Sequence, residues 1–479
     1  MNVAELARGI VMAGIDGVAI DGMPQFGGYL LFGGEAIGVV EMRALADALR
    51  RRNGGLPPLI AIDQEGGPVM RLREGVEPMP AMMALGAAGD IELAARAGEA
   101  IAFDLRRAGC TLDFAPVLDL ATEPENTVIG TRSLGSDPQL VAQLGLAVGT
   151  ALLRGGMLPC YKHFPGHGST AIDSHEALPV VDVAEDALRA RDLVPFAQVA
   201  PGAPAMMSAH VVARAFDREK PATLSPAIAD LLRRELGFRG ALVTDCLEMN
   251  AVAERGSVES ALQALAVGAD LLVFSHSREL AEAAVAAISK AVEDGRISRE
   301  RLREAHGRVN ALRQAAAAPL PLDASPPHPG IGREIARRAV TLVRGLAHAD
   351  PIASVAVSFG DPGAALEREA PALTLVAAPR DPSPAEIAAL LAAVEEHDRR
   401  PLLLARRAHR YAGQAAAIGA LLHRYPDAMV ISLLEPFDVA LFEPARHVLA
   451  TCGDGPVSLA GLADVIFGGS MPTGRLPIL

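Results

Sequence analysis

Residues 157–163, MLPCYKH, form an apolar run that ends in a charged pair, Lys162 and His163. A helix-length segment precedes this run at 136–155, where Asp137 stands before Pro138 as a capping side chain before a proline at the first helical position. Helical patterns also separate most of the other apolar runs between residues 9 and 276, so the sequence predicts parallel strands that alternate with helices. Those seven further runs are GIVMAGI, GGYLLF, PLIAID, TLDFAPV, AMMSAH, ALVTD and LLVFSH.

Eight strands in this pattern favour an α/β fold of the (β/α)8 TIM-like barrel type. A doubly wound sheet stays open as an alternative, because hydrophobic periodicity alone does not separate the two. The connection at 16–27 is short for a parallel crossover, so the first unit is expected to be irregular or its strand antiparallel. The predicted helices span 36–52, 90–109, 136–155, 185–199, 225–237, 257–267 and 278–294.

A proline-rich segment separates this region from a second one. Five prolines fall within 319–330, and proline fixes φ and removes a hydrogen-bond donor, which predicts a stiff extended linker. Beyond it, five apolar runs alternate with helical segments, one of which opens with a capping box at Ser383 and Glu386. We therefore expect a barrel at 1–316, a linker at 317–330, and at 331–479 a second α/β sandwich domain, an open sheet with helices on both faces.

The composition excludes several classes of protein. The 479 residues include 44 basic and 57 acidic side chains, and the net charge of −13 disfavours nucleic acid or an anionic membrane surface as a partner. The four cysteines form no C-x-x-C pair, so neither a zinc ribbon nor a disulfide framework is expected. The N-terminus lacks a basic n-region, and no apolar run is long enough to span a membrane. These features predict a cytoplasmic protein with reduced thiols.

Charged residues gather at the carboxyl ends of the predicted strands. Asp63, Lys162, His163, His210 and Asp245 each end an apolar run. In a barrel these ends form one mouth, which is where active sites of this fold lie. The sequence therefore predicts a site built from several strand ends.

The loop after Lys162 and His163, within KHFPGHGSTAIDSH at 162–175, favours proton transfer over metal binding. Its histidines lack the HExxH spacing and no cysteine joins them, so no metal is expected. Asp173 can accept a hydrogen bond from His175, which fixes the tautomer and leaves the other ring nitrogen for a substrate. Cys246 has acidic neighbours, which disfavour the thiolate that a cysteine nucleophile needs.

Four motifs together resemble glycoside hydrolase family 3: IDQEGGPVMR at 62–71, VIGTRS at 128–133, the KHFPGHG…DSH loop, and Thr244-Asp245. The resemblance runs over about 9–315 and is greatest to the bacterial β-N-acetylglucosaminidases, or β-hexosaminidases, of peptidoglycan recycling. The end of the chain, FGGSMPTGRLPI, resembles more loosely the α/β sandwich that follows the barrel in many members. The resemblance implies retaining hydrolysis of terminal β-linked N-acetylglucosamine from muropeptides or chitooligosaccharides, through a covalent glycosyl-enzyme and without a cofactor.

The same resemblance implies a role for each site residue. Asp245 matches the nucleophile, and His175 matches the general acid/base with Asp173 as its partner. This departs from the two carboxylates of most glycosidases, but an imidazolium can protonate a leaving oxygen and afterwards, once neutral, deprotonate water. The residues that match the set holding the sugar are Asp63, Arg71, Arg132, Lys162 and His163, and charged groups suit the hydroxyls of a sugar.

Three other functions compete with hydrolysis. A phosphorylase on the same scaffold stays open, because a neutral histidine does not repel phosphate as a carboxylate does. A β-glucosidase is disfavoured by Cys246, which stands where the related β-glucosidases often carry tryptophan. A non-catalytic sugar-binding module is disfavoured by the intact Asp173, His175 and Asp245. Because the chain has no tryptophan and four tyrosines, we expect a small carbohydrate substrate rather than an extended polysaccharide.

Overall fold

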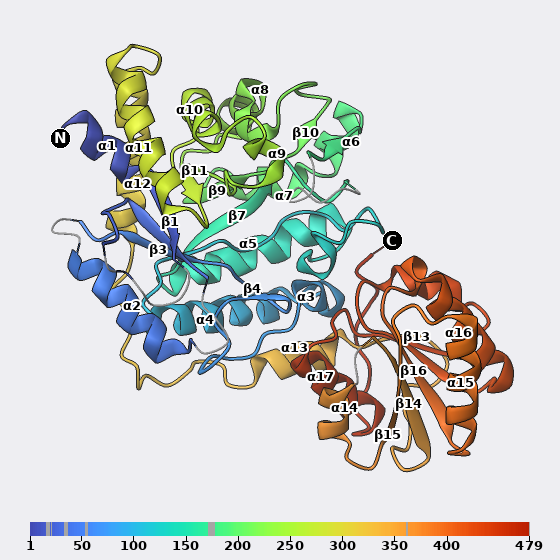
Figure 1. Cartoon of the computed structure of the whole chain (residues 1–479). Helices are drawn as coiled ribbons and strands as arrows, with labels where there is room; N and C mark the ends of the chain where they lie inside the picture. The colour runs from blue at the N-terminus through green and yellow to red at the C-terminus, as the bar shows by residue number, and fades with distance from the viewer. Residues whose placement is uncertain are drawn as a thin grey trace.

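The computed structural model describes residues 1–15, 20, 22–32, 37–52, 56–170, 178–360 and 363–478. Figure 1 shows a larger region, coloured blue to yellow, beside a smaller one in orange and red that holds the second sheet. Within the described residues, no helix is both long enough and apolar enough to cross a lipid bilayer.

The larger region is a nearly closed barrel of eight parallel strands. The strands are β1 (Val11–Ile15), β2 (Gly28–Leu31), β3 (Leu59–Ile62), β6 (Leu112–Asp113), β7 (Leu158–Phe164), β9 (Ala205–Ser208), β11 (Ala241–Thr244) and β12 (Leu272–Phe274). They follow the order β11-β9-β7-β6-β3-β2-β1-β12, and a parallel bridge between Val243 and Leu271 joins the two end strands. All eight predicted strands are confirmed, and the doubly wound alternative is wrong.

The first unit of the barrel is irregular but parallel. Strands β1 and β2 pair in parallel register from Met12 opposite Gly28 to Ile15 opposite Leu31, so the antiparallel alternative is wrong. The described residues of the connection, 20 and 22–27, contain no helix. Gly27 permits this tight path, because a Cβ atom there would overlap the carbonyl oxygen of Gly9.

Helices surround the barrel largely where the sequence predicts them. Five predictions are confirmed as α2 (Val39–Arg52), α4 (Ile91–Arg107), α5 (Pro138–Arg154), α10 (Ser257–Val267) and α11 (Arg278–Glu293). The segment 185–199 was wrong as one helix: it forms α6 (Glu185–Ala190) and α7 (Val194–Val199), since Pro195 cannot continue a helix and instead begins the second one. Likewise, the segment 225–237 forms two elements, α8 (Pro226–Asp230) and a short π-helix, η3 (Leu231–Glu235).

Several further elements of the barrel region were not predicted. They are α1 (Val3–Gly9), α3 (Met82–Ala88), α9 (Asn250–Ala253), α12 (Arg299–Ala315), the pairs β4 (Gln64–Gly66) with β5 (Val69–Met70) and β8 (Val180–Val181) with β10 (Val212–Ala213), and the turns η1 (Gly130–Arg132) and η2 (Ala222–Leu224). Among these, η1 and the β4–β5 pair matter for the site because they follow β6 and β3 at the barrel mouth.

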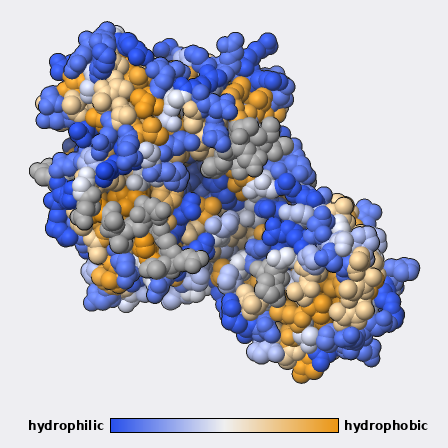
Figure 2. All heavy atoms as spheres, viewed as in Figure 1, coloured by the Kyte–Doolittle hydropathy of each residue, from blue (hydrophilic) through white to orange (hydrophobic). Residues whose placement is uncertain are grey.

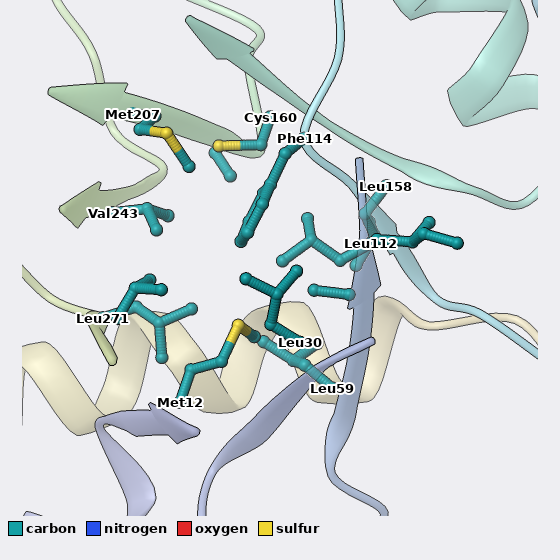
Figure 3. Packing of buried hydrophobic residues seen from close by; sticks show 14 of the residues in the cluster. Met12, Leu30, Leu59, Leu112, Phe114, Leu158, Cys160, Met207, Val243 and Leu271 are labelled. Atoms are coloured by element: carbon teal, nitrogen blue, oxygen red, sulfur yellow. The ribbon is translucent and has the colours of Figure 1, made fainter. Parts of the chain in front are cut away.

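Apolar side chains fill the inside of the barrel. Figure 3 shows them converging from the strands, and they include Met12, Leu30, Leu59, Leu112, Phe114, Leu158, Cys160, Met207, Val243 and Leu271. Each of these is at most 4% exposed. The barrel is therefore a packed core rather than a channel, and polar groups are confined to its ends.

The second region is an open sheet with helices on both faces, as predicted. Its strands are β13 (Thr341–Arg344), β14 (Ser354–Phe359), β15 (Thr374–Ala378), β16 (Arg400–Ala405), β17 (Met429–Ser432) and β18 (His447–Ala450), in the order β13-β18-β17-β16-β14-β15. All pair in parallel except the unpredicted β13, which is antiparallel to β18. One face packs against α14 (Ala364–Glu369) and α17 (Pro456–Ile466), the other against α15 (Pro384–Glu395) and α16 (Ala412–Arg424).

Residues 316–330 join the two regions without a helix or strand. Arginines of the barrel hold this segment by its carbonyl oxygens: Arg43 donates to Leu320 at 2.7 Å and Arg106 donates to Ala318 at 2.7 Å. Helix α13 (Ile331–Ala339) follows and packs against both α3 and α17. The turns η4 (Ala408–Arg410) and η5 (Pro436–Phe442) complete the second region.

Candidate active site

A pocket of about 500 Å³ opens at the carboxyl ends of the barrel strands. Its charged and titratable lining consists of Asp63, Glu65, Arg71, Arg132, Lys162, His163, His167, Asp245, Cys246, Glu248 and His276. Six of the eight residues that the sequence assigns to the site are therefore brought together in this strand-end pocket. The other two, Asp173 and His175, lie in 171–177, outside the described residues.

Four of these side chains form an ion cluster, made of Asp63, Glu65, Arg132 and Lys162. The ammonium of Lys162 lies 2.7 Å from Asp63 Oδ1 and 2.6 Å from Glu65 Oε1. Arg132 binds both oxygens of Glu65, at 2.7 and 2.8 Å. Two cations thus balance two carboxylates, and each side chain is held by at least one oppositely charged partner.

Charge pairing overrides burial within the ion cluster. Burial alone would raise the pKa of Glu65, which is 1% exposed, but Arg132 and Lys162 hold that pKa far below its usual value. Burial would lower the pKa of Lys162, but Asp63 and Glu65 raise it instead. Glu65 and Lys162 are therefore both charged at neutral pH.

A third carboxyl group, Asp113, lies fully buried beneath the cluster. Its Oδ1 accepts a hydrogen bond from the backbone N–H of Gln64 at 3.0 Å, and its Oδ2 has no partner among the described residues. Burial raises the pKa of Asp113 well above its usual value. Asp113 is therefore protonated and leaves the charge balance of the cluster unchanged.

Asp119 fixes the base of the histidine-containing loop. Its carboxylate accepts from His163 Nδ1 at 2.6 Å and from the backbone N–H groups of His163 and His167 at 3.1 and 2.6 Å. Burial would raise the pKa of Asp119, but the two histidines and these hydrogen bonds lower it, so it stays ionised. The bond to Nδ1 leaves Nε2 of His163 near Arg132, 3.5 Å from Nη2.

His167 is a poor candidate for an acid at neutral pH. It is 2% exposed, and burial lowers its pKa to about 4 in spite of the nearby carboxylate of Asp119. The imidazole is thus uncharged at neutral pH and has no extra proton to give.

Asp245 directly follows β11 and faces the pocket. Its Oδ1 accepts from the backbone N–H of Cys246 at 2.7 Å. Burial would raise the pKa of Asp245, but His210, His163 and this N–H lower it below its usual value. Asp245 is therefore an ionised carboxylate with one oxygen held by the backbone.

His210 does not line the pocket, although it also follows a strand end. It is fully buried, with Nδ1 2.9 Å from Thr223 Oγ1 and Nε2 2.9 Å from the carbonyl oxygen of Cys246. Since a carbonyl only accepts, Nε2 carries the proton and donates it there. His210 thus supports the backbone beside Asp245.

Two other groups near Asp245 are occupied or unreactive. Glu248 accepts from the backbone N–H groups of His276 and Ser277, both at 2.8 Å, at the start of α11. Burial raises the pKa of the Cys246 thiol to about 11, so a thiolate is scarce at neutral pH. Within the described residues, no group of three or more His, Cys, Asp or Glu side chains is placed to hold a metal ion.

A second cavity, of about 870 Å³, lies between the barrel and the sheet region. Figure 2 shows the viewed face hollowed between the two regions. This interdomain cavity shares Val69, Val128 and Arg132 with the strand-end pocket, so the two cavities adjoin at these residues. Its lining from the sheet region includes Arg380, Arg406, Arg407, Tyr411 and Asp454.

Sequence reasoning missed Glu65 and Asp119 as site residues. A signal was present for both: Glu65 stands two residues after Asp63 within the quoted IDQEGGPVMR motif, and Asp119 follows the run TLDFAPV. Arg71, which was predicted, lies at the rim with its guanidinium carbon 5.4 Å from the centre of the Phe32 ring.

Comparison with known proteins accounts for this arrangement. Residues 22–312 match the family described as "Glycosyl hydrolase family 3 N terminal domain". A β-hexosaminidase of Chromobacterium violaceum is 38% identical over 300 residues, covering 59% of this chain and 83% of that protein. A β-hexosaminidase of Alkalilimnicola ehrlichii is 39% identical over 317 residues, covering 63% and 89%.

Among solved structures, a family 3 β-N-acetylglucosaminidase from Paenibacillus sp. str. FPU-7 is 34% identical with a TM-score of 0.91, covering 100% of this chain and 99% of that one. A β-glucoside phosphorylase shares the fold, with a TM-score of 0.85 at 19% identity, covering 100% and 94%. With matching motifs, fold and pocket, the chain belongs to glycoside hydrolase family 3.

Proposed function

We propose that the protein is a β-N-acetylhexosaminidase that removes terminal β-linked N-acetylglucosamine from small glycans. The relatives of known activity support this class of reaction. The observation that carries the proposal is the pocket itself, in which an ionised Asp245 faces the ion cluster of Asp63, Glu65, Arg132 and Lys162.

In the proposed mechanism Asp245 is the nucleophile. Its Oδ1 is held by the N–H of Cys246, so Oδ2 attacks the anomeric carbon while the leaving oxygen takes a proton. The resulting glycosyl-enzyme reacts with water, which gives up a proton and releases the sugar with retained configuration. We assign both proton transfers to His175, with Asp173 orienting it, because the sequence motif places them in the loop that starts at this pocket.

The sugar-holding residues suit a ligand rich in hydroxyl groups. Asp63, Lys162 and Arg132 are each fixed by a charged neighbour before any substrate arrives. Together with Arg71 they offer three charged donors and one charged acceptor, whose hydrogen bonds are stronger than neutral ones, and His163 adds a ring nitrogen. Substrate binding therefore requires little further ordering of these side chains, which keeps its entropy cost low.

The interdomain cavity is where the leaving group would lie, since it adjoins the pocket. Pro68 and Met70 line it. Its lining holds five arginines and one aspartate. Arg132 and Arg407 are paired with Glu65 and Glu435, and Arg406 with Asp454, so the excess positive charge comes from Arg73 and Arg380. This favours an acidic leaving group, as in muropeptides, over the neutral chitooligosaccharides.

Assays with two aryl glycosides test the function directly. The β-N-acetylglucosaminide should be cleaved far faster than the matching β-glucoside, and EDTA should have no effect. Free N-acetylglucosamine should be the product with or without added phosphate. Equal rates on both glycosides would contradict the specificity, and a sugar 1-phosphate would establish the phosphorylase alternative instead.

Labelling identifies the nucleophile. A fluorinated slow substrate should leave its sugar on the peptide that contains Thr244 and Asp245. Label on Glu248 or Asp63 would refute the assignment. Glu248 is the more demanding control because it lines the same pocket with both oxygens already bound by backbone N–H groups.

The role of His175 is tested by leaving-group dependence. His175→Ala should slow glycosylation most for poor leaving groups, which need a proton. An activated substrate should still form the glycosyl-enzyme, which should accumulate, and azide should restore turnover because it needs no base. Asp173→Ala should show a milder form, with the basic limb of the pH profile moved to lower pH. A uniform loss without azide rescue would reduce His175 to a sugar-binding role.

A further inference from the structure

The sheet region places one carboxylate against the barrel mouth. Glu435 lies between β17 and η5 and is 3% exposed. Its Oε1 accepts from the backbone N–H of Thr131 at 2.9 Å, across the interface between the two regions. Arg407 of the same region binds both oxygens, through Nε and Nη2, each at 2.6 Å. The carboxylate is therefore held firmly and aimed at a single N–H of the barrel.

Thr131 is the residue before Arg132, the member of the ion cluster that the pocket and the interdomain cavity share. Both belong to η1, and Arg132 binds Glu65 through two hydrogen bonds. A backbone held at Thr131 therefore sets the point from which the Arg132 side chain starts. If the backbone at Thr131 shifted, the guanidinium of Arg132 would move relative to Glu65 and to the bound sugar.

Short-range hydrogen bonds shape the segment 126–132: the N–H of Ile129 donates to Asn126 Oδ1 at 2.9 Å, and that of Arg132 donates to the carbonyl oxygen of Ile129 at 2.8 Å. At the start of the segment, Asn126 Nδ2 donates to the carbonyl oxygens of His167 and Gly168 in the histidine-containing loop, at 2.9 and 3.2 Å. The η1 turn itself is three residues long, too short to be stable alone. Contact with Glu435 thus fixes the end of the segment that carries Arg132.

Gly130 shows how closely the two regions meet at this point. Its φ is +46°, and a Cβ atom there would overlap the carboxylate of Glu435. Glycine is therefore needed both for the backbone conformation and for the approach of the carboxylate. The fit is specific to Glu435 and is not a general surface contact.

We propose that Glu435 is a positioning residue for sugar binding: the C-terminal region, through Glu435, holds Arg132 in the geometry that binds the terminal sugar. Glu435 itself does not touch the substrate. The effect on kinetics rests on the proposed function, whereas the effect on the backbone of Thr131 does not.

The first test is kinetic and uses the full chain. Glu435→Ala should raise KM for an aryl β-N-acetylglucosaminide by roughly tenfold to a hundredfold, and weaken inhibition by free N-acetylglucosamine equally, with a smaller change in kcat. Glu435→Gln should be milder, because its side-chain carbonyl still accepts from Thr131. Unchanged KM in Glu435→Ala would overturn the proposal.

A matched control separates positioning from simple stability. Arg96 and Glu334 form another two-point ion pair between the regions, at 2.7 and 3.1 Å, away from both cavities. Glu334→Ala should lower Tm yet leave KM unchanged. An equal rise of KM in both variants would mean that any loosened interface has this effect, and would also overturn the proposal.

A double-variant cycle tests whether Glu435 acts through Arg132. With Arg132→Ala already present, Glu435→Ala should change KM by less than about twofold, since the side chain to be positioned is gone. If the rise in KM of the double variant equalled the product of the two single rises, Glu435 would act independently of Arg132 and the inference would be refuted.

Hydrogen exchange provides a readout that does not depend on activity. The amide of Thr131 should exchange faster in Glu435→Ala than in the wild-type chain and the Glu334→Ala control. Equal protection of the Thr131 amide in all three chains would overturn the proposal. A lack of activity on N-acetylglucosaminides would refute only the proposed function and would leave this exchange test valid. Should Glu435→Ala fail to fold, Gly130→Ala displaces the same contact from the barrel side and should raise KM in the same way.

Discussion

The barrel and the sheet region both carry charged residues at the carboxyl ends of parallel strands, but they use them differently. In the barrel, Asp63, Lys162 and Asp245 follow or end strands and line an open pocket. In the sheet region, Arg407 after β16 is bound to Glu435 after β17, and Glu435 also binds the barrel. One set of strand ends is left open to a ligand, whereas the other is occupied by protein partners.

This difference shows what the position of a residue in an α/β fold does and does not predict. Strand ends collect functional groups because the chain there leaves the sheet and its side chains are no longer packed. Whether such a group serves chemistry or support depends on what faces it. In the sheet region, the group that Glu435 binds is a backbone N–H of the barrel and not a ligand.

The largest contrast is expected for two aspartates with similar local structure. Asp245 follows β11 and accepts from the N–H of Cys246 at 2.7 Å, while Asp381 follows β15 and accepts from the N–H of Gly413 at 2.7 Å. Asp245→Asn should lower kcat by roughly 10⁴-fold or more, as expected for a lost nucleophile, whereas Asp381→Asn should leave it within about twofold. Steady-state rates on the aryl glycoside measure both.

Thermal unfolding serves as the control for this pair, since neither substitution removes a packed side chain. If Asp381→Asn lowered kcat as strongly as Asp245→Asn, strand ends of the sheet region would also serve catalysis. The strand ends of the two regions would then not differ in function.

Much of the fold was predictable because its signals are local. Apolar runs gave the strands, and capping residues such as Asp137 and Ser383 gave helix starts that the structure confirms. Strand β13 was missed because its four residues, Thr341–Arg344, are partly exposed and form an antiparallel edge without a long apolar run. The break between α6 and α7 follows from Pro195, a local signal that was overlooked.

The residues that line the pocket were largely predictable, but the contact that supports them from the sheet region was not. Asp63, Lys162 and Asp245 share a pocket because strand ends of one barrel meet at one mouth. No local pattern marks Glu435, because its function depends on a contact with Thr131, which is 304 positions away in the chain. Such a contact arises from the docking of two regions, which periodicity does not encode.

Buried and exposed ion clusters of the two regions should differ in stability. Lys162 is 3% exposed between Asp63 and Glu65, whereas Arg333 of the sheet region binds Glu369 and Asp464 with its own side chain 47% exposed. Lys162→Met removes the cation that pairs with Asp63 and one of the two that pair with Glu65, and should cost roughly 3–5 kcal/mol of unfolding free energy. Arg333→Met should cost at most about 1 kcal/mol, because solvent screens exposed pairs.

Urea unfolding at neutral pH measures both free energies, and high salt provides a further control. Salt should weaken the effect of Arg333→Met but leave that of Lys162→Met nearly unchanged, since buried pairs are screened less. A similar cost for both variants would mean that burial does not distinguish the two clusters.

The smallest effect is expected for two carboxyl groups whose burial is only partly compensated, Asp104 in α4 and Asp438 in η5. Burial raises the pKa of Asp104 to about 6, although the N–H of Glu77 and the charge of Arg107 oppose it. Burial also raises the pKa of Asp438, against hydrogen bonds from Ser432 at 2.5 Å and the N–H of Ala408 at 3.2 Å. Each group thus binds its proton more tightly in the folded state.

The sign of the pH dependence follows from that shift. A carboxyl with a raised folded pKa favours folding at low pH, and this contribution is lost as the pH rises from the unfolded pKa, near 4, to the folded pKa, about 6 for Asp104. Asp104→Asn removes the titration, and its side-chain oxygen can still accept from Glu77. The variant should therefore be more stable than the wild type by roughly 1–3 kcal/mol at pH 8, with the advantage vanishing below pH 4. Asp438→Asn should show the same sign, and neither variant should alter kcat/KM. Urea unfolding at pH 4 and pH 8 checks this, and a stability difference that does not change with pH would show that these carboxyls are not strained by burial in either region.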